Sequence, residues 1–152
     1  MVEVKLTPSE IYSGAQAGVL RQVQNLTKDG SKPTRGLENN DSDWQLHIEG
    51  VLAEQAVAKH LNVYFAGKGL RGDKDVGEYE VRTTDRANGR LLIRNTDSDD
   101  GFYLLCTGLN GVYQIHGGIY GREAKQDKYW DEKLPRPCWA VPQSDLYFRE
   151  EG

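Results

Sequence analysis

The sequence has little cysteine, no excess of positive charge and no long apolar run, and each absence excludes a class of protein. Its formal charge of −4 excludes a histone-like protein that holds nucleic acid by bulk charge, although a cation site is itself acidic. No stretch approaches the roughly 18 apolar residues of a membrane span, and the N-terminus shows no secretion signal. We therefore expect an intracellular, cytoplasmic protein without a membrane partner.

Cysteine occurs at two positions, and both lie in apolar runs. Cys106 follows Leu104 and Leu105, and Cys138 opens the run Cys-Trp-Ala-Val. A free cysteine in such a run usually behaves as a small apolar side chain. The sequence therefore predicts two buried thiols, as expected in a reducing compartment.

Several familiar catalytic patterns are also missing from the sequence. His47, His60 and His116 show no metal-ligand spacing, and no Gly-Lys-Ser/Thr completes a phosphate-binding loop. No arrangement of serine or cysteine nucleophile with histidine can be argued from the sequence. We interpret the three histidines as structural, with His116 on a predicted strand as the one alternative candidate for lining a cleft.

Two helices are predicted in the first part of the chain. Thr7 and Glu10 form a capping box around Pro8, and the helix that follows ends near Asp29-Gly30. Its apolar residues recur at helical spacing and give it one apolar face: Ile11, Ala15, Val19, Val23 and Leu26.

The second helix, 42–61, begins with a capping box of Ser42 and Gln45. It is apolar nearly all round, which is typical of a buried helix. Glu54 projects from this apolar surface, so its carboxylate needs a partner.

The pattern changes to strands after the second helix. The Asn88-Gly89 turn predicts a hairpin between two strands, and a second pair is expected further on. The expected elements are a strand at 62–65, a pair at 78–84 and 90–94, a pair at 102–107 and 112–120, a short polar helix at 121–130 and a last strand at 138–141. Helices first and strands after predict an α+β (mixed α/β) fold, with N-terminal helices followed by a central mixed β-sheet of about five or six strands. The 152 residues fit a single domain spanning 1–152.

The residues that point to chemistry are Asp75, Glu80 and Arg82. In a strand, alternate side chains share a face, so Glu80 and Arg82 point the same way, and Gly77 allows a bend that brings Asp75 beside Glu80. Two adjacent carboxylates repel each other unless a cation lies between them. Mg²⁺ is often bound by one or two carboxylates together with substrate phosphate. The alternative is a loop acid beside a surface ion pair of Glu80 with Arg82.

Asp75 followed by Glu80-Val81-Arg82 resembles the Asp…(Asp/Glu)-x-Lys signature of the restriction-endonuclease-like nuclease superfamily. The segment 50–58 is similar to the first core helix of that superfamily, which commonly carries a glutamate near the metal, here Glu54. The layout from Leu6 to Gln143 looks like that of small phage-type members. The resemblance implies a restriction-endonuclease-like core and a nuclease encoded by a phage in a bacterial host.

The resemblance further implies a Mg²⁺- or Mn²⁺-dependent deoxyribonuclease, an endonuclease more than an exonuclease, with DNA as its partner and a homodimer as a plausible assembly. Asp75 and Glu80 would hold the metal, with the Val81 carbonyl as a further ligand and Glu54 as an outer or second-metal ligand. Arg82 would hold the scissile phosphate. For Glu54, the alternative is an ion pair with a cation in the core.

Arg82 departs from the superfamily, whose members usually have lysine at this position. Arginine keeps the charge and grips phosphate but cannot give up a proton. Lys68, Lys74 and Lys125 are further candidates for the missing lysine. The departure leaves open a second interpretation, a catalytically weakened or inactive nuclease-fold module that binds DNA or a protein partner. A third interpretation is a structural or inhibitory phage protein that binds partners through aromatic side chains.

Two basic stretches could contact a phosphate backbone. One is a glycine-rich segment, 67–74, just before Asp75. The other, 122–136, interleaves basic residues with Tyr129 and Trp130 but also contains acidic residues. For both, a solvated surface is the interpretation favoured by the sequence.

Overall fold

The computed structural model describes residues 1–27, 43–65 and 74–149. The helical elements are α1 (Pro8–Thr27), α2 (Asp43–Leu61), α3 (Gly121–Ala124) and the 3-10 turns η2 (Asp127–Tyr129) and η3 (Gln143–Asp145). The strands are β1 (Val2–Lys5), β2 (Tyr79–Thr84), β3 (Leu91–Ile93), β4 (Phe102–Leu109), β5 (Val112–Tyr120), β6 (Trp130–Asp131) and β7 (Cys138–Val141).

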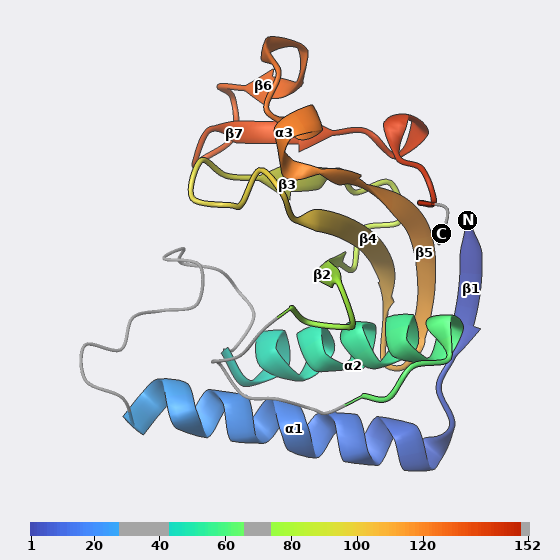
Figure 1. The fold of residues 1–152 in the computed structure, drawn as a ribbon. Helices are drawn as coiled ribbons and strands as arrows, with labels where there is room; N and C mark the ends of the chain where they lie inside the picture. The colour runs from blue at the N-terminus through green and yellow to red at the C-terminus, as the bar shows by residue number, and fades with distance from the viewer. Residues whose placement is uncertain (28–42, 66–73, 150–152) are drawn as a thin grey trace.

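The elements stack in layers, as Figure 1 shows: α1 lies outermost, α2 lies on it, and two sheets follow. The first sheet has the order β1-β5-β4-β2, and the second has the order β3-β7-β6. In the first sheet β2 runs parallel to β4, whereas the pairs β4–β5 and β1–β5 are antiparallel. The predicted α+β class is confirmed, but the predicted central sheet of about five or six strands is wrong, since the strands form a mixed four-stranded sheet and a separate three-stranded sheet.

The first helix forms as predicted, but most of its predicted apolar face is not the face that packs on α2. Thr7 and Glu10 exchange the two hydrogen bonds of the capping box, at 2.7 and 3.2 Å. The residues that α1 buries are Gly14, Gly18, Gln22 and Asn25. The reason is close packing, because a Cβ on Gly18 would lie 2.5 Å from the Cα of Ile48 in α2. Most of the predicted apolar face is consequently exposed, at Val19, Val23 and Leu26.

The second helix is buried, as its sequence predicts. Val51, Ala53, Ala56 and Val57 have no exposed surface. The helix packs against the first sheet, and the core cluster between them includes Leu104 and other residues of β1, β2, β4 and β5. The proposed N-cap of this helix, at position 42, lies outside the described residues.

The strands after α2 were predicted in part. The β4–β5 hairpin and the last strand, β7, are confirmed. The predicted strand at 62–65 is wrong, since these residues form a turn followed by irregular chain. The region 121–130 contains the short helix α3 and the 3-10 turn η2 in place of one helix. The edge strand β1 was not expected from the sequence.

The predicted hairpin of β2 with β3 is wrong. The turn is present, with Gly89 donating to the Arg86 carbonyl at 3.0 Å, but β3 pairs with β7 in the second sheet. β2 instead has β4 on one side. On the other edge of β2, the Asp75 side chain takes the place of a neighbouring strand at one position, because the Val81 N–H donates to its carboxylate. That carboxylate therefore occupies a donor that a hairpin partner would need.

A second core cluster lies between the two sheets and includes Leu91, Ile93, Tyr103, Leu105 and Val141. Both cysteines are buried and unpaired, as predicted, and burial raises the pKa of Cys106 to about 12. Within the described ranges, none of the helices has the length and apolarity needed to cross a membrane.

Candidate functional site

The predicted shared face of Glu80 and Arg82 is confirmed by the register of β2. Glu80 lies beside Tyr103 of β4, and Arg82 lies beside Leu105. Paired residues of parallel strands point to the same face, and both β4 residues belong to the core between the sheets. Glu80 and Arg82 therefore face the second sheet, on the side of the first sheet away from α2.

Asp75 reaches the outer edge of β2 through a tight turn. Val76 and Tyr79 exchange backbone hydrogen bonds of 3.1 and 2.8 Å across Gly77, whose φ of 54° lies in the left-handed region. The Asp75 Oδ2 then accepts the Val81 N–H at 2.9 Å. The bend predicted at Gly77 is thus present.

Glu80 is half-buried next to Asp75. Burial first, and then the Asp75 charge and a hydrogen bond between the two carboxyl groups, raise the pKa of Glu80 to about 7. Lys74 and Arg82 act in the opposite direction through their positive charges. The two carboxyl groups therefore lie close enough to share a proton, which is how adjacent acids relieve their repulsion when no cation separates them.

The Val81 carbonyl completes a set of oxygen atoms at this edge. In a strand the N–H and C=O of one residue point to the same side. Since the Val81 N–H is directed at Asp75, its carbonyl also lies on the outer edge of β2. Two carboxyl groups and one carbonyl, all hard oxygen donors, are the ligand types that Mg²⁺ and Mn²⁺ accept.

Arg82 is held in place by Asp97 and Tyr103, neither of which belongs to the motif around Glu80. Its Nη2 donates to Asp97 Oδ1 at 2.7 Å, and its guanidinium carbon lies 5.0 Å from the centre of the Tyr103 ring. Asp97 Oδ2 also accepts the Arg94 N–H at 2.8 Å. The ion pair considered between Arg82 and Glu80 is therefore replaced by one with Asp97. The only sequence signal for Asp97 is the run of turn-forming residues after β3.

Glu54 is in the ion pair that was the alternative to a metal-site role. Arg21 of α1 grips its carboxylate with two hydrogen bonds of 2.8 and 3.1 Å. Both side chains are largely buried. Burial raises the pKa of Glu54 against the effect of Arg21, and the charge of Asp75 also raises it. Glu54 thus lies within electrostatic reach of Asp75, on the other face of the sheet from Glu80.

The lysine candidates fall in different places. Lys74 lies near Glu80, as its effect on the Glu80 pKa indicates. Lys125 donates to the Asp97 carbonyl and to the Asp99 carboxylate, both at 2.6 Å, so it supports the segment that holds Arg82. Lys68 and most of the glycine-rich stretch 67–74 lie outside the described residues. His116 bonds to Thr107 at 2.7 Å.

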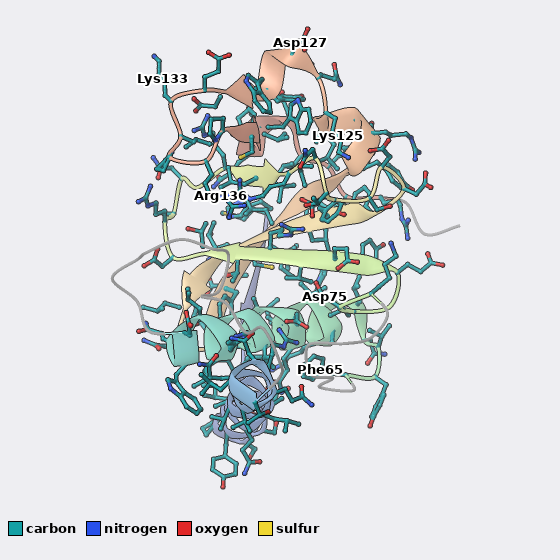
Figure 2. The ribbon with its side chains drawn as sticks, turned by 90° about the vertical axis from the view of Figure 1, so that its left-hand side faces the viewer. Phe65, Asp75, Lys125, Asp127, Lys133 and Arg136 are labelled. Carbon is teal, nitrogen blue, oxygen red and sulfur yellow. The ribbon has the colours of Figure 1, made fainter. Side chains whose placement is uncertain are left out.

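A strongly basic hollow begins at Arg82. Its volume is about 760 Å³, and it runs along the end of β2 toward the second sheet. The arginines that line it are Arg82, Arg86, Arg90, Arg94 and Arg136. Figure 2 shows Asp75 on the α2 side of β2 and Arg136 on the side of the second sheet. Neither Arg86 nor Arg90 was a candidate from the sequence, because their gathering depends on the crossing from β2 to β3.

Among the residues that the structure describes, no group of three or more histidine, cysteine or acidic side chains could hold a metal ion. The candidate centre is therefore the pair Asp75 and Glu80 with the Val81 carbonyl, next to a basic hollow. Comparison with known proteins adds no family: no family model, no curated protein and no solved structure matches the chain.

Proposed function

We propose that this chain is a divalent-metal-dependent deoxyribonuclease, with Asp75 and Glu80 as the metal ligands. The observation that carries the proposal is the pairing of these two carboxyl groups at the outer edge of β2, beside a hollow lined by arginines. Like charges are placed together at a cost that a bound cation removes. Arginines next to such a pair suit an anionic polymer as substrate.

The donor set fits Mg²⁺ or Mn²⁺, which would be held by Asp75, Glu80 and the Val81 carbonyl. A bound ion would supply a water of lowered pKa and neutralise charge that develops on the phosphodiester. The turn at Gly77 and the hydrogen bond to the Val81 N–H fix the Asp75 carboxylate before any ligand binds. Such fixed positions reduce the reorganisation required during reaction.

Arg82 has a positioning role in this proposal. Its guanidinium cannot accept a proton, so it serves as a contact for the scissile phosphate and not as a base. Asp97 and Tyr103 hold the group in one orientation, which lowers the entropy lost when a phosphate binds. Lys74, whose positive charge lowers the pKa of Glu80, is the described lysine that we assign as the substitute for the usual one.

The proposal includes a restriction-endonuclease-like core, and it is supported by a buried helix, α2, packed on a mixed sheet whose edge strand β2 carries Glu80 and follows Asp75. It also includes endonucleolytic cleavage by a homodimer, because cutting both strands requires two sites. Glu54 is assigned to the ion pair with Arg21, with a metal role only through its influence on Asp75.

A second candidate function is a nuclease-fold module that binds DNA without cutting it. The observation that favours it is the engagement of Arg82 by Asp97, which uses part of the guanidinium that would face the phosphate. The two functions differ in metal binding. Isothermal titration with Mn²⁺ at millimolar concentration gives heat for the nuclease and none for the binding module.

The test of the nuclease is cleavage of supercoiled plasmid and of linear DNA by the purified protein with Mg²⁺ or Mn²⁺. We expect Asp75→Asn to lower the cleavage rate at least 100-fold, the order of effect for losing a major stabilising group at the reacting centre. The matched control is Asp100→Asn, because the Asp100 side chain is 93% exposed and lies outside the site. Cleavage by a folded Asp75→Asn protein at the parent rate contradicts the proposal.

A further inference from the structure

The basic hollow adjoins a second hollow whose wall includes two tryptophan side chains. This second hollow has a volume of about 740 Å³ and is lined by Trp130 and Trp139 among others. Arg94 and Arg136 line both hollows, so the two adjoin. One continuous concave surface therefore leads from Arg82, two positions after Glu80, to the tryptophans of the second sheet.

The first hollow is positive although the whole chain is negative. Its described lining includes five arginines and no acidic side chain, whereas the formal charge of the chain is −4. The carboxylates that pair with Arg82 and Arg90 come from Asp97 and Asp131, which lie outside that lining. These pairs fix the two guanidinium groups in place. Guanidinium groups held in fixed orientations suit charge-assisted, bidentate hydrogen bonds to the phosphates of a nucleic-acid backbone.

Trp130 offers a flat ring at the far end of this surface. The residue is 43% exposed, and its ring meets Trp139 edge to face, with 5.1 Å between centres and 69° between planes. Trp139 in turn has the Lys125 ammonium 6.0 Å from its ring centre. Trp130 is thus supported on one side and open on another. An exposed indole with a fixed orientation suits stacking against a planar ligand.

We propose that the two hollows form one binding site for single-stranded DNA, with phosphates on the arginines and an unpaired base stacked on Trp130. This inference rests on the proposed nuclease function for the choice of DNA, and it narrows the substrate to DNA with a single-stranded segment. Bases of an intact duplex are stacked on each other and cannot offer a face to Trp130 unless they are flipped out. Asn95 and Asp127, which also line the second hollow, supply polar groups for the edge of the base.

Binding is measured apart from cleavage, with the parent protein in EDTA and a fluorescein-labelled oligodeoxythymidine followed by anisotropy. We expect tighter binding of this strand than of a duplex of the same length. Trp130→Ala should weaken the single strand by roughly five-fold to a hundred-fold, the range that base stacking on an aromatic side chain gives. Trp130→Phe should recover part of the loss.

The matched control is Trp44→Ala. Trp44 is 42% exposed, nearly the same as Trp130, but lies on α2, which covers the face of the first sheet opposite to the second sheet (Figure 1). Trp44→Ala should leave the affinity for the single strand unchanged. Thermal unfolding of each variant checks that the variant protein is folded. Arg136→Gln should weaken both the single strand and the duplex, because it contacts phosphate and not base.

The outcomes separate this inference from the proposed function. Unchanged single-strand binding by folded Trp130→Ala, or tighter binding of duplex DNA or of RNA, overturns the inference. If the single-strand inference is overturned but cleavage of DNA still depends on Asp75, the proposed nuclease function stands without the single-strand site. If the expected binding pattern appears and no metal-dependent cleavage is found, the single-strand site stands and the nuclease fails.

Discussion

At the residue scale, the ionisation of Glu80 links the site to the stability of the protein. Its pKa is raised from 4.5 to about 7, first by burial and then by Asp75. Between these values the folded chain binds more protons than the unfolded chain, so stability falls as pH rises. The contribution of Glu80 is fully present below pH 4.5 and is lost as pH passes through about 7.

We therefore expect the melting temperature of the protein in EDTA to decrease between pH 5 and pH 8 through this group. Glu80→Gln should flatten the decrease, because the amide does not ionise. Glu132→Gln, the same change at an exposed residue, should not alter the slope. The measurement is thermal unfolding by circular dichroism at a series of pH values. Equal slopes in the parent and in Glu80→Gln would show that this carboxyl group is not the source.

The buried ion pair of Arg21 with Glu54 gives a second prediction. Removing one partner leaves a buried charge without its counter-ion, which typically costs about 3–5 kcal/mol. Arg21→Met should lower the free energy of unfolding by this order, as measured with urea. The double variant Arg21→Met/Glu54→Leu should recover much of the loss, since neither charge remains. A double variant less stable than Arg21→Met would mean that Glu54 has a further essential partner.

The sequence predicted the pairing of Asp75 with Glu80 because both lie in one short segment with Gly77 between them. It did not predict Asp97 as the partner of Arg82, since that contact depends on the chain leaving one sheet for another. It also left two partners open for Glu54. Burial required a partner for this carboxylate but did not choose between a metal and Arg21.

At the element scale, the contact of α1 with α2 depends on small residues. A Cβ at Gly18 would lie 2.5 Å from the Ile48 Cα and 2.9 Å from its nitrogen. Alanine is a better helix former than glycine by about 1 kcal/mol, but the clash is with backbone and cannot be relieved by a rotamer change. We expect Gly18→Ala to destabilise the protein by about 1–3 kcal/mol, the usual range for overpacking.

Gly50→Ala in α2 is the control for this prediction. Its Cβ would meet only Arg21 Nη1, at 3.9 Å, so helix propensity decides the sign and the change should be neutral or stabilising. Urea unfolding of both variants provides the comparison. Equal effects at the two positions would contradict the close packing at Gly18.

The apolar face of α1 shows why periodicity alone did not identify the face of this helix that packs on α2. The pattern marked Val19 and Val23 correctly as lying on one face, but it did not show which face packs inward. Glycine lets two helices approach closely, and this packing outweighs the burial of a few branched side chains. Similarly, the Asn88-Gly89 turn was predicted correctly, whereas its strands enter different sheets.

At the scale of the whole molecule, the sequence predicted most helices and strands in their order, apart from β1, β6 and a wrong strand at 62–65, but it did not predict their division into two sheets. Local periodicity identifies a strand, whereas its partners are set by contacts distant in sequence. The parallel pairing of β2 with β4 is such a contact, because the connecting chain passes through β3 in the second sheet. That crossing also gathers the arginines around one hollow, so the basic surface could not be predicted from their positions in sequence.

The charge of the molecule is uneven, with a hollow lined by arginines in a chain of net negative charge, so its affinity for DNA should depend on salt concentration. Binding through the basic hollow releases counterions from the phosphates, so the logarithm of the association constant should fall linearly with the logarithm of salt concentration. For single strands the slope is about −0.7 for each phosphate neutralised, so Arg136→Gln should reduce its magnitude by roughly 0.7. Lys5→Gln is the control, since Lys5 lies on β1 at the opposite edge of the first sheet from β2. Fluorescence anisotropy in EDTA over a series of NaCl concentrations gives both slopes. Equal slopes for the parent and Arg136→Gln would show that Arg136 does not contact a phosphate. If it did, the variant would release fewer counterions on binding and its slope would be smaller in magnitude.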